Sequence, residues 1–197
     1  MISWDERYSD QDYVYGKQPN TFLASVIDQI PKGRVLCLCE GEGRNAVYLA
    51  EQGFDVTAVD ASAVGLAKAR QLAEERKVNI ETITSDLGEY PVNASNWDAV
   101  VSIFCHIPPD IRAQVHQQLV SALNPGGLLV LEAYTPRQIE YGTGGPPVPE
   151  LTMTLDILRN ELAGLDFIHA EEFDRDVIEG KYHTGKGAVV QVLATKA

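Results

Sequence analysis

The sequence has few basic residues and no long apolar segment. Its 197 residues carry 16 Lys and Arg against 28 Asp and Glu, for a net charge of −12, and the basic residues are scattered. A field of that sign repels nucleic acid and anionic membranes, so we expect neither as a partner. No stretch approaches the ~20 apolar residues of a membrane-spanning helix, and the first ten residues lack the pattern of a signal peptide. We therefore expect a cytoplasmic protein whose partner is a small molecule.

Cysteine is also scarce. The three cysteines are an odd number, with two in one predicted strand, which indicates reduced thiols. Cys37 and Cys39 are two residues apart, so we expect them on one face of the strand, where packing is their expected role. A pair is far short of a zinc ligand set, and no metal is expected. The length suits one α/β domain over residues 1–197, as a monomer or a homodimer.

The stretch RVLCLCEGEGRNAVYLA, residues 34–50, predicts a strand, a glycine turn and a helix. Its apolar run is typical of a strand buried on both faces, and the residues after the turn have an apolar helical face. In a parallel sheet such a turn lies at the carboxyl end of a strand. There, Gly41 and Gly43 allow a ligand close to the backbone, and the helix offers free N–H groups. The turn predicts a nucleotide-sized site, unless its glycines serve only the bend.

Two further predicted strands end in acidic residues. Residues 55–59 lead into Asp60, which follows Gly43 at close to the ~20-residue offset of a ribose-binding carboxylate. The alternative is a surface residue that caps the next helix with Ser62. After a third strand over residues 80–83, Asp86 could accept from an adenine amine while Leu87 contacts the ring. The alternative is an Asx turn.

A fourth strand, residues 99–104, leads to His106, which could accept a proton from a substrate or only satisfy the backbone before two prolines. A fifth strand over residues 128–133 precedes a segment rich in Pro and Gly, residues 134–150, interpreted as a substrate-side cover. Strands over 167–173 and 188–194 are expected to pair antiparallel, with an exposed His183 between them.

The first twenty residues hold four aromatic side chains without an apolar period. Aromatic residues in such a segment cannot build their own core, so they are expected to cover something else. A lid over the site is one interpretation. The alternative is a loosely ordered leader attached to the sheet edge. Asn20 or Thr21 is expected to cap a helix that continues to Ile30.

Taken in order, these motifs resemble the class I S-adenosylmethionine-dependent methyltransferases over almost the whole chain. The segments WDERY, YVYG and EGEGRNAVYLA are similar to small bacterial methyltransferases of the tellurite-resistance and thiopurine-methyltransferase kind. The resemblance implies a doubly wound α/β fold, Rossmann-like, with a mostly parallel seven-stranded sheet whose last strand is antiparallel. It implies S-adenosyl-L-methionine as cofactor and a methyltransferase acting on a small-molecule nucleophile: a thiol, a metalloid oxyanion or an amine.

The resemblance also assigns roles by position. The glycine turn would contact the methionine part of the cofactor, Asp60 the ribose, and Asp86 with Leu87 the adenine. Where the family has an acidic residue and a first glycine this chain has cysteines, so we expect Glu40 and its neighbours to take part instead. The expected cofactor-binding residues are Tyr15, Asn20, Glu40, Gly41, Gly43, Arg44, Asn45, Asp60, Ala61, Asp86, Leu87 and Phe104. His106 is the expected catalytic group, as a base for an amine or hydroxyl acceptor, or to orient a soft anion.

Two other functions fit parts of the sequence. Residues 41–46, GEGRNA, also satisfy the G-x-G-x-x-G/A pattern of nicotinamide-dependent oxidoreductases. That pattern alone is weak, and neither the segment around Asp86 nor the terminal hairpin is required by a dinucleotide fold. The other alternative is a catalytically silent S-adenosylmethionine-binding protein that regulates a partner.

Overall fold

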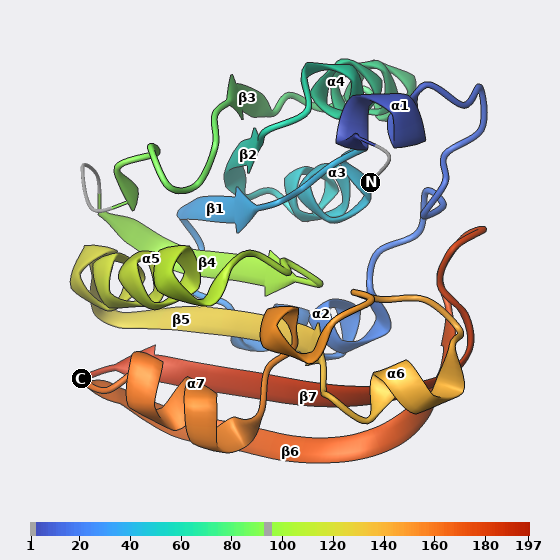
Figure 1. Ribbon diagram of the computed structural model, residues 1–197. Helices are drawn as coiled ribbons and strands as arrows, with labels where there is room; N and C mark the ends of the chain where they lie inside the picture. Colours follow the sequence, from blue (N-terminus) through green and yellow to red (C-terminus); the bar gives the residue numbers. More distant parts are fainter. Residues whose placement is uncertain (1–2, 93–95) are drawn as a thin grey trace.

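A twisted sheet runs through the middle of the molecule (Figure 1). The computed structural model describes residues 3–92 and 96–197, and in them the sheet has seven strands in the order β3-β2-β1-β4-β5-β7-β6. The strands are β1 (Arg34–Leu38), β2 (Asp55–Asp60), β3 (Glu81–Thr84), β4 (Trp97–Ile103), β5 (Leu123–Tyr134), β6 (Leu165–Ile178) and β7 (Thr184–Lys196). Strands β1 to β5 pair in parallel, and β7 is antiparallel to both β5 and β6. The expected fold class is confirmed.

The helices cover both faces of the sheet. They are α1 (Trp4–Tyr8), α2 (Thr21–Val26), η1 (Ile27–Gln29), α3 (Arg44–Glu51), α4 (Ala63–Arg76), α5 (Pro109–Ala122), α6 (Gln138–Tyr141), η3 (Pro149–Leu151) and α7 (Leu155–Glu161). One core cluster joins α5 and α7 to the sheet, and a second joins α2, α3 and α4 to its other face. Alternate residues of the central strands serve the two clusters, as the pleat requires: Leu36 and Leu38 face α5, whereas Val35 and Cys37 face α2.

Side-chain caps fix where several helices begin. The Asn20 side chain accepts from the Leu23 N–H at 3.0 Å at the start of α2, and Ser62 accepts from the Gly65 N–H at 3.0 Å at the start of α4. Thr154 caps α7 in the same way. Within residues 3–92 and 96–197, no helix has both the length and the apolar character needed to cross a bilayer.

Three expectations need correction. The segment 134–150 is not wholly irregular, because α6 lies within it. Cys37 and Cys39 do not share a face: Cys39 has a φ of +50°, which turns it toward the cluster on the α5 side. His183 is buried, with 8% of its surface exposed, because β6 and β7 are longer than predicted and their connection folds back over the carboxyl ends of the parallel strands.

The strand order creates a switch point between β1 and β4. From β1 the chain continues to β2 and β3 on one side, and then to β4 and β5 on the other. The connections that follow β1 and β4 therefore diverge, which leaves a crevice at the carboxyl ends of these two strands. In open α/β sheets, ligands bind at this place.

Candidate functional site

The glycine turn lies at the switch point, between β1 and α3. Gly41 and Gly43 have φ angles of +61° and +89°, in a backbone region that residues other than glycine rarely adopt. A Cβ at Gly43 would lie 2.5 Å from the Cβ of Ala69 on α4, and a Cβ at Gly41 would lie 2.5 Å from the Tyr8 hydroxyl. Glycine at these positions therefore lets both α4 and α1 approach the turn.

Glu40 binds the amino end of α3. Its Oε1 accepts from the N–H of Asn45 at 3.0 Å and from the N–H of Ala46 at 2.8 Å. Burial raises the pKa of Glu40 to about 7, against the opposing effects of these hydrogen bonds and of Arg44. The structure brings Glu40, Arg44 and Asn45 together, although their contact with a cofactor stays a prediction.

Asp60, at the end of β2, is tied to the same turn. One carboxylate oxygen accepts from the Gly41 N–H and the other from the Ser62 N–H, both at 2.8 Å. Burial raises the pKa of Asp60. The next residue, Ala61, is exposed. Ser62, and not Asp60, caps α4. The Asp60 carboxylate lies at the carboxyl ends of the parallel strands, where the ribose hypothesis requires it.

Asp86 stands apart from these groups. It is exposed, and its Oδ1 accepts from the Gly88 N–H at 2.7 Å, which is the Asx-turn contact that the alternative interpretation describes. Leu87 is buried in the core cluster on the α5 side. The adenine contacts of this pair stay a prediction.

Aromatic rings gather beyond β4, and sequence reasoning did not predict that they form a cluster. The Phe104 ring stacks on Tyr134 at 4.5 Å between centroids and lies 4.7 Å from His183. Tyr15, from the amino-terminal segment, lies 4.6 Å from His183. Phe104 has a φ of +53°, which is rare for a bulky residue and occurs most often at functional sites.

His106 lies beside this cluster, with both ring nitrogens engaged. Its Nδ1 is 2.8 Å from the Leu151 carbonyl oxygen, and its Nε2 accepts from the Tyr134 N–H at 3.3 Å. These partners require the neutral ring with its proton on Nδ1. Burial, with a smaller effect of Arg112, lowers the pKa of His106 to about 4. The backbone contacts match the alternative interpretation, and a role in proton transfer stays a prediction.

The amino-terminal segment packs across the turn. Helix α1 lies on α4 (Figure 1). The Tyr8 side chain is buried against Gly41 and Gly65. The Lys68 ammonium donates to the carbonyl oxygens of Asp10 and Asp12. The segment also reaches the β6–β7 connection, where the Lys181 N–H donates to the Val14 carbonyl at 2.7 Å. This placement suits a lid, which stays a prediction.

A buried ionic network joins the lid segment to β5 and the hairpin. Arg175 donates to Glu132 at 2.6 Å and to Glu179 at 2.9 Å, and Arg44 donates to Glu179 at 2.6 Å. The Asn20 amide donates to Glu132 at 2.8 Å and to Glu179 at 3.1 Å. Sequence reasoning missed this network. The available signal was Glu132, a carboxylate within an apolar strand, which must find a buried partner.

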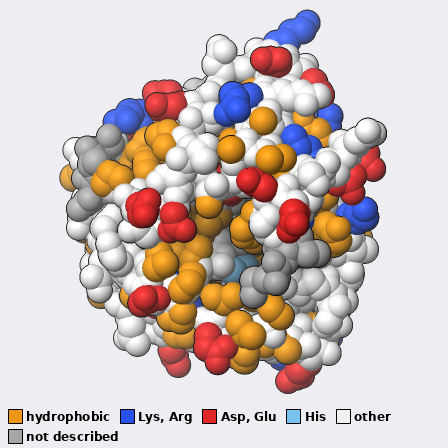
Figure 2. Space-filling model, turned by 45° about the horizontal axis from the view of Figure 1, so that its top comes forward, with side chains coloured by type: hydrophobic (Ala, Val, Ile, Leu, Met, Phe, Trp, Pro, Cys, Tyr) orange, Lys and Arg blue, Asp and Glu red, His pale blue; other side chains and the backbone are white. Residues whose placement is uncertain are grey.

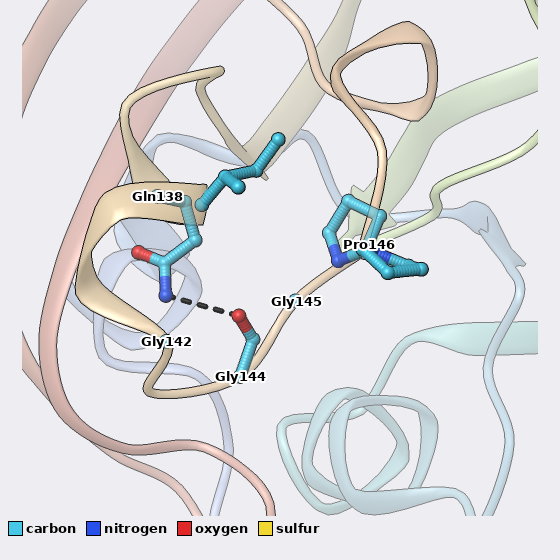
Figure 3. Close-up of a pocket in the computed structure, with 7 residues that line it drawn as sticks. Gln138, Gly142, Gly144, Gly145 and Pro146 are labelled. Carbon is cyan, nitrogen blue, oxygen red and sulfur yellow. Dashed lines mark hydrogen bonds between the residues drawn. The ribbon is translucent and has the colours of Figure 1, made fainter.

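The segment 134–150 forms a small pocket of its own (Figure 3). Gln138 donates from Nε2 to the Gly144 carbonyl at 3.0 Å, and the pocket has a volume of about 240 Å³. A Cβ at Gly145 would lie 2.7 Å from the Tyr134 ring, so this segment packs directly on the aromatic cluster. Its role as a substrate-side cover stays a prediction.

One face of the molecule is hollowed near its middle (Figure 2). Hydrophobic side chains and several carboxylates surround the hollow, and a histidine lies inside it. Over the described ranges, no group of three or more His, Cys, Asp or Glu residues is placed to hold a metal ion. Because carboxylates and hydrophobic side chains surround the hollow, the site can attract a cation and can exclude water from a reacting group.

Comparisons with known proteins agree with this geometry. The family model described as "Methyltransferase domain" matches residues 35–127. A glycine/sarcosine N-methyltransferase of Halorhodospira halochloris is 29% identical over 137 residues, which are 67% of this chain and 48% of the relative. TehB of Haemophilus influenzae is 28% identical over 158 residues, which are 77% of this chain and 52% of the relative. The chain spans about half the length of these relatives.

Solved structures share the fold. The crystal structure of TehB from Haemophilus influenzae superposes with a TM-score of 0.73 at 20% identity, covering 98% of this chain and 66% of that one. A structure from work on conversion of a disulfide bond into a thioacetal group during echinomycin biosynthesis gives a TM-score of 0.78 at 20% identity, covering 98% and 87%. Residues 35–127 thus match a methyltransferase domain, and the chain as a whole shares the fold of TehB and resembles the class I S-adenosylmethionine-dependent methyltransferases.

Proposed function

We propose that the protein transfers a methyl group from S-adenosylmethionine to a small-molecule nucleophile, a thiol, a metalloid oxyanion or an amine, by in-line displacement. The observation that carries the proposal is the position of Asp60. Its buried carboxylate ends β2 and is held by the N–H of Gly41, beside the switch point of the sheet. A carboxylate in that position can accept from the two hydroxyls of a ribose.

The neighbouring residues fit the remainder of the cofactor. The Arg44 Nη1 and the His183 Nδ1 are both buried and find no hydrogen-bond partner among the described residues. Arg44 could therefore hold the carboxylate of the methionine part. Glu40 and the net charge of −12 favour a cationic ligand, and the faces of Phe104 and Tyr134 attract cations as well.

S-adenosylmethionine, when bound, supplies a methyl carbon that its sulfonium already makes electrophilic. The protein has to align the acceptor and exclude water, and orientation of this kind can contribute about 7–11 kcal/mol in the best models. Residues 134–150, the lid segment and the aromatic cluster are the parts that would do so. No base is required for an acceptor that arrives as a thiolate or an oxyanion.

An amine acceptor needs a group that takes its proton. His106 is neutral at pH 7, since its pKa is about 4, but its Nε2 must first leave the Tyr134 N–H. His183 has an unpartnered Nδ1 over the range the structure describes, although burial lowers its pKa to about 3. Both are weak bases, which favours a soft anionic acceptor over an amine.

The experiment is a screen with a labelled methyl donor. Purified protein is incubated with small thiols, metalloid oxyanions and amines, with glycine and sarcosine among the amines because of the relative's name. We expect label in one class of acceptor, with one S-adenosylhomocysteine formed per methyl transferred. Binding of the donor without transfer to any acceptor would favour the regulatory protein instead. Reduction of NAD in place of methyl transfer would establish an oxidoreductase.

The variant His106→Gln separates the two acceptor types. For a thiolate or oxyanion, we expect kcat in the variant to follow the wild-type dependence on pH. For an amine, loss of the base should lower kcat by about 10²–10⁴. A wild-type rate on an amine in the variant would exclude His106 as the base.

A further inference from the structure

Two thiols face each other across the switch point. Cys39 follows β1 and Cys105 follows β4, and their sulfur atoms lie 2.6 Å apart. Cys39 is half-buried, and Cys105 is 4% exposed. The third cysteine, Cys37, packs in the core on the opposite face of the sheet. The pair therefore lies where the crevice between the two strands begins.

The backbone aims these thiols at each other. A regular strand would place Cys39 on the same face as Cys37, but its φ of +50° directs it to the cluster that contains Cys105. The residue before Cys105, Phe104, has a φ of +53°. Left-handed backbone at non-glycine residues costs free energy and persists where the surroundings hold it. The backbone directly after β1 and the backbone directly after β4 are both held in this way.

The separation of the sulfur atoms indicates what chemistry the pair can perform. It is well inside the ~3.5–4.0 Å at which non-bonded carbon atoms settle, and it exceeds the length of a disulfide, about 2.05 Å, by about half an ångström. Two thiolates that share a tetrahedral zinc ion, with bonds of about 2.3 Å, would hold their sulfur atoms about 3.8 Å apart. The geometry fits a sulfur–sulfur bond better than a shared metal.

We propose that Cys39 and Cys105 form a reversible disulfide that closes the crevice between β1 and β4, with a hydroperoxide as the oxidant. The more exposed Cys39, as its thiolate, attacks the peroxide, so that a sulfur–oxygen bond forms and the oxygen–oxygen bond breaks. Cys105 then attacks the sulfenic sulfur, and the hydroxyl group leaves as water. Overall, two thiols are oxidised to one disulfide, and hydrogen peroxide is reduced to two molecules of water.

The effect on ligand binding rests on the proposed function. A bond between the ends of β1 and β4 prevents them from moving apart at the place proposed for the methionine part of the cofactor. The oxidised protein should therefore bind S-adenosylhomocysteine more weakly than the reduced protein. The hydrogen bond to Cys105 and, to a lesser degree, burial raise the pKa of Cys39, so that oxidation is slow at neutral pH and accelerates as the pH rises.

The test treats the full-length protein with hydrogen peroxide and follows both the cross-link and the binding. Intact mass and peptide mapping should show loss of two hydrogen atoms and a Cys39–Cys105 peptide pair. Calorimetry with S-adenosylhomocysteine should then show an affinity reduced about tenfold or more, with recovery after dithiothreitol. Cys37→Ala, which keeps the pair, should behave in the same way. Cys105→Ser should bind equally before and after the oxidant.

The outcomes separate the two proposals. Oxidation to sulfinic acid without a cross-link, or a cross-link that leaves the affinity unchanged, would overturn the switch and leave the proposed function intact. A reduced protein with no affinity for S-adenosylhomocysteine would overturn both. If Cys105→Ser does not fold, Cys39→Ser provides the same comparison.

Discussion

The variant Glu40→Gln should change how the stability of the protein depends on pH. Glu40 is 9% exposed, and one oxygen of its carboxylate accepts from both the Asn45 and Ala46 N–H groups. Glutamine is neutral at every pH, and its side-chain oxygen can accept from the same two donors. The substitution therefore removes the charge and retains the hydrogen bonds.

The size of the effect follows from the pKa. Burial raises the pKa of Glu40 from 4.5 to about 7. Between these values the folded protein keeps the proton and the unfolded chain has released it, so stability falls as the pH rises. The loss is complete above pH 7 and amounts to about 3 kcal/mol of the free energy of unfolding. Glu40→Gln should match the wild type near pH 4.5 and exceed it by about 3 kcal/mol above pH 8.

Urea unfolding of both proteins from pH 4.5 to 8.5 measures this difference. Burial lowers the pKa values of His106 and His183, so both histidines destabilise the protein as the pH falls below 6.5. Both proteins share that contribution, and it cancels in the comparison. Glu171→Gln, at an exposed position on β6, is the matched control and should follow the wild type throughout. A difference between Glu40→Gln and wild type that is constant with pH would refute the reasoning.

Three further results are expected. Binding of cationic S-adenosylmethionine beside Glu40 should release up to about one proton from this carboxyl group near pH 7. The release would appear as unequal calorimetric heats of binding in two buffers with different ionisation enthalpies, and equal heats would count against it. Deletion of residues 1–16 should weaken cofactor binding about tenfold or more with the core still folded by circular dichroism, and an unchanged affinity would reject the lid. Arg175→Ala, which leaves the buried Glu132 carboxylate without its arginine partner, should lower the free energy of unfolding by about 3–5 kcal/mol. The control Lys186→Ala, at an exposed ion pair, should lower it by less than about 1 kcal/mol. Equal losses in the two variants would contradict the network.

The elements that depend on local patterns could be predicted from the sequence. The strand, glycine turn and helix at residues 34–51 follow from an apolar run, two glycines and a helical period, all within a short window. The position of Asp60 could also be predicted, because the residues that end its strand and begin the next helix are close to it in the sequence. These signals place the edge of the sheet and the switch point.

The parts that depend on distant contacts could not be predicted. His183 was expected at the surface because a turn usually is exposed, but Tyr15 and Tyr134 cover it from other elements. The Arg175 network joins segments far apart in the chain, since Arg175 binds Glu132 and Arg44 binds Glu179, so no local pattern encodes these pairs. Cys39 was assigned by strand alternation, which fails once its φ becomes positive.

Calorimetric titration of the purified protein with S-adenosylhomocysteine and, separately, with NAD tests the central claim most directly, when wild type is compared with Asp60→Ala. We predict one S-adenosylhomocysteine site per chain, no binding of NAD, and an affinity for S-adenosylhomocysteine reduced at least about tenfold in the folded variant. Binding of NAD alone, or an unchanged affinity in the variant, would contradict the account.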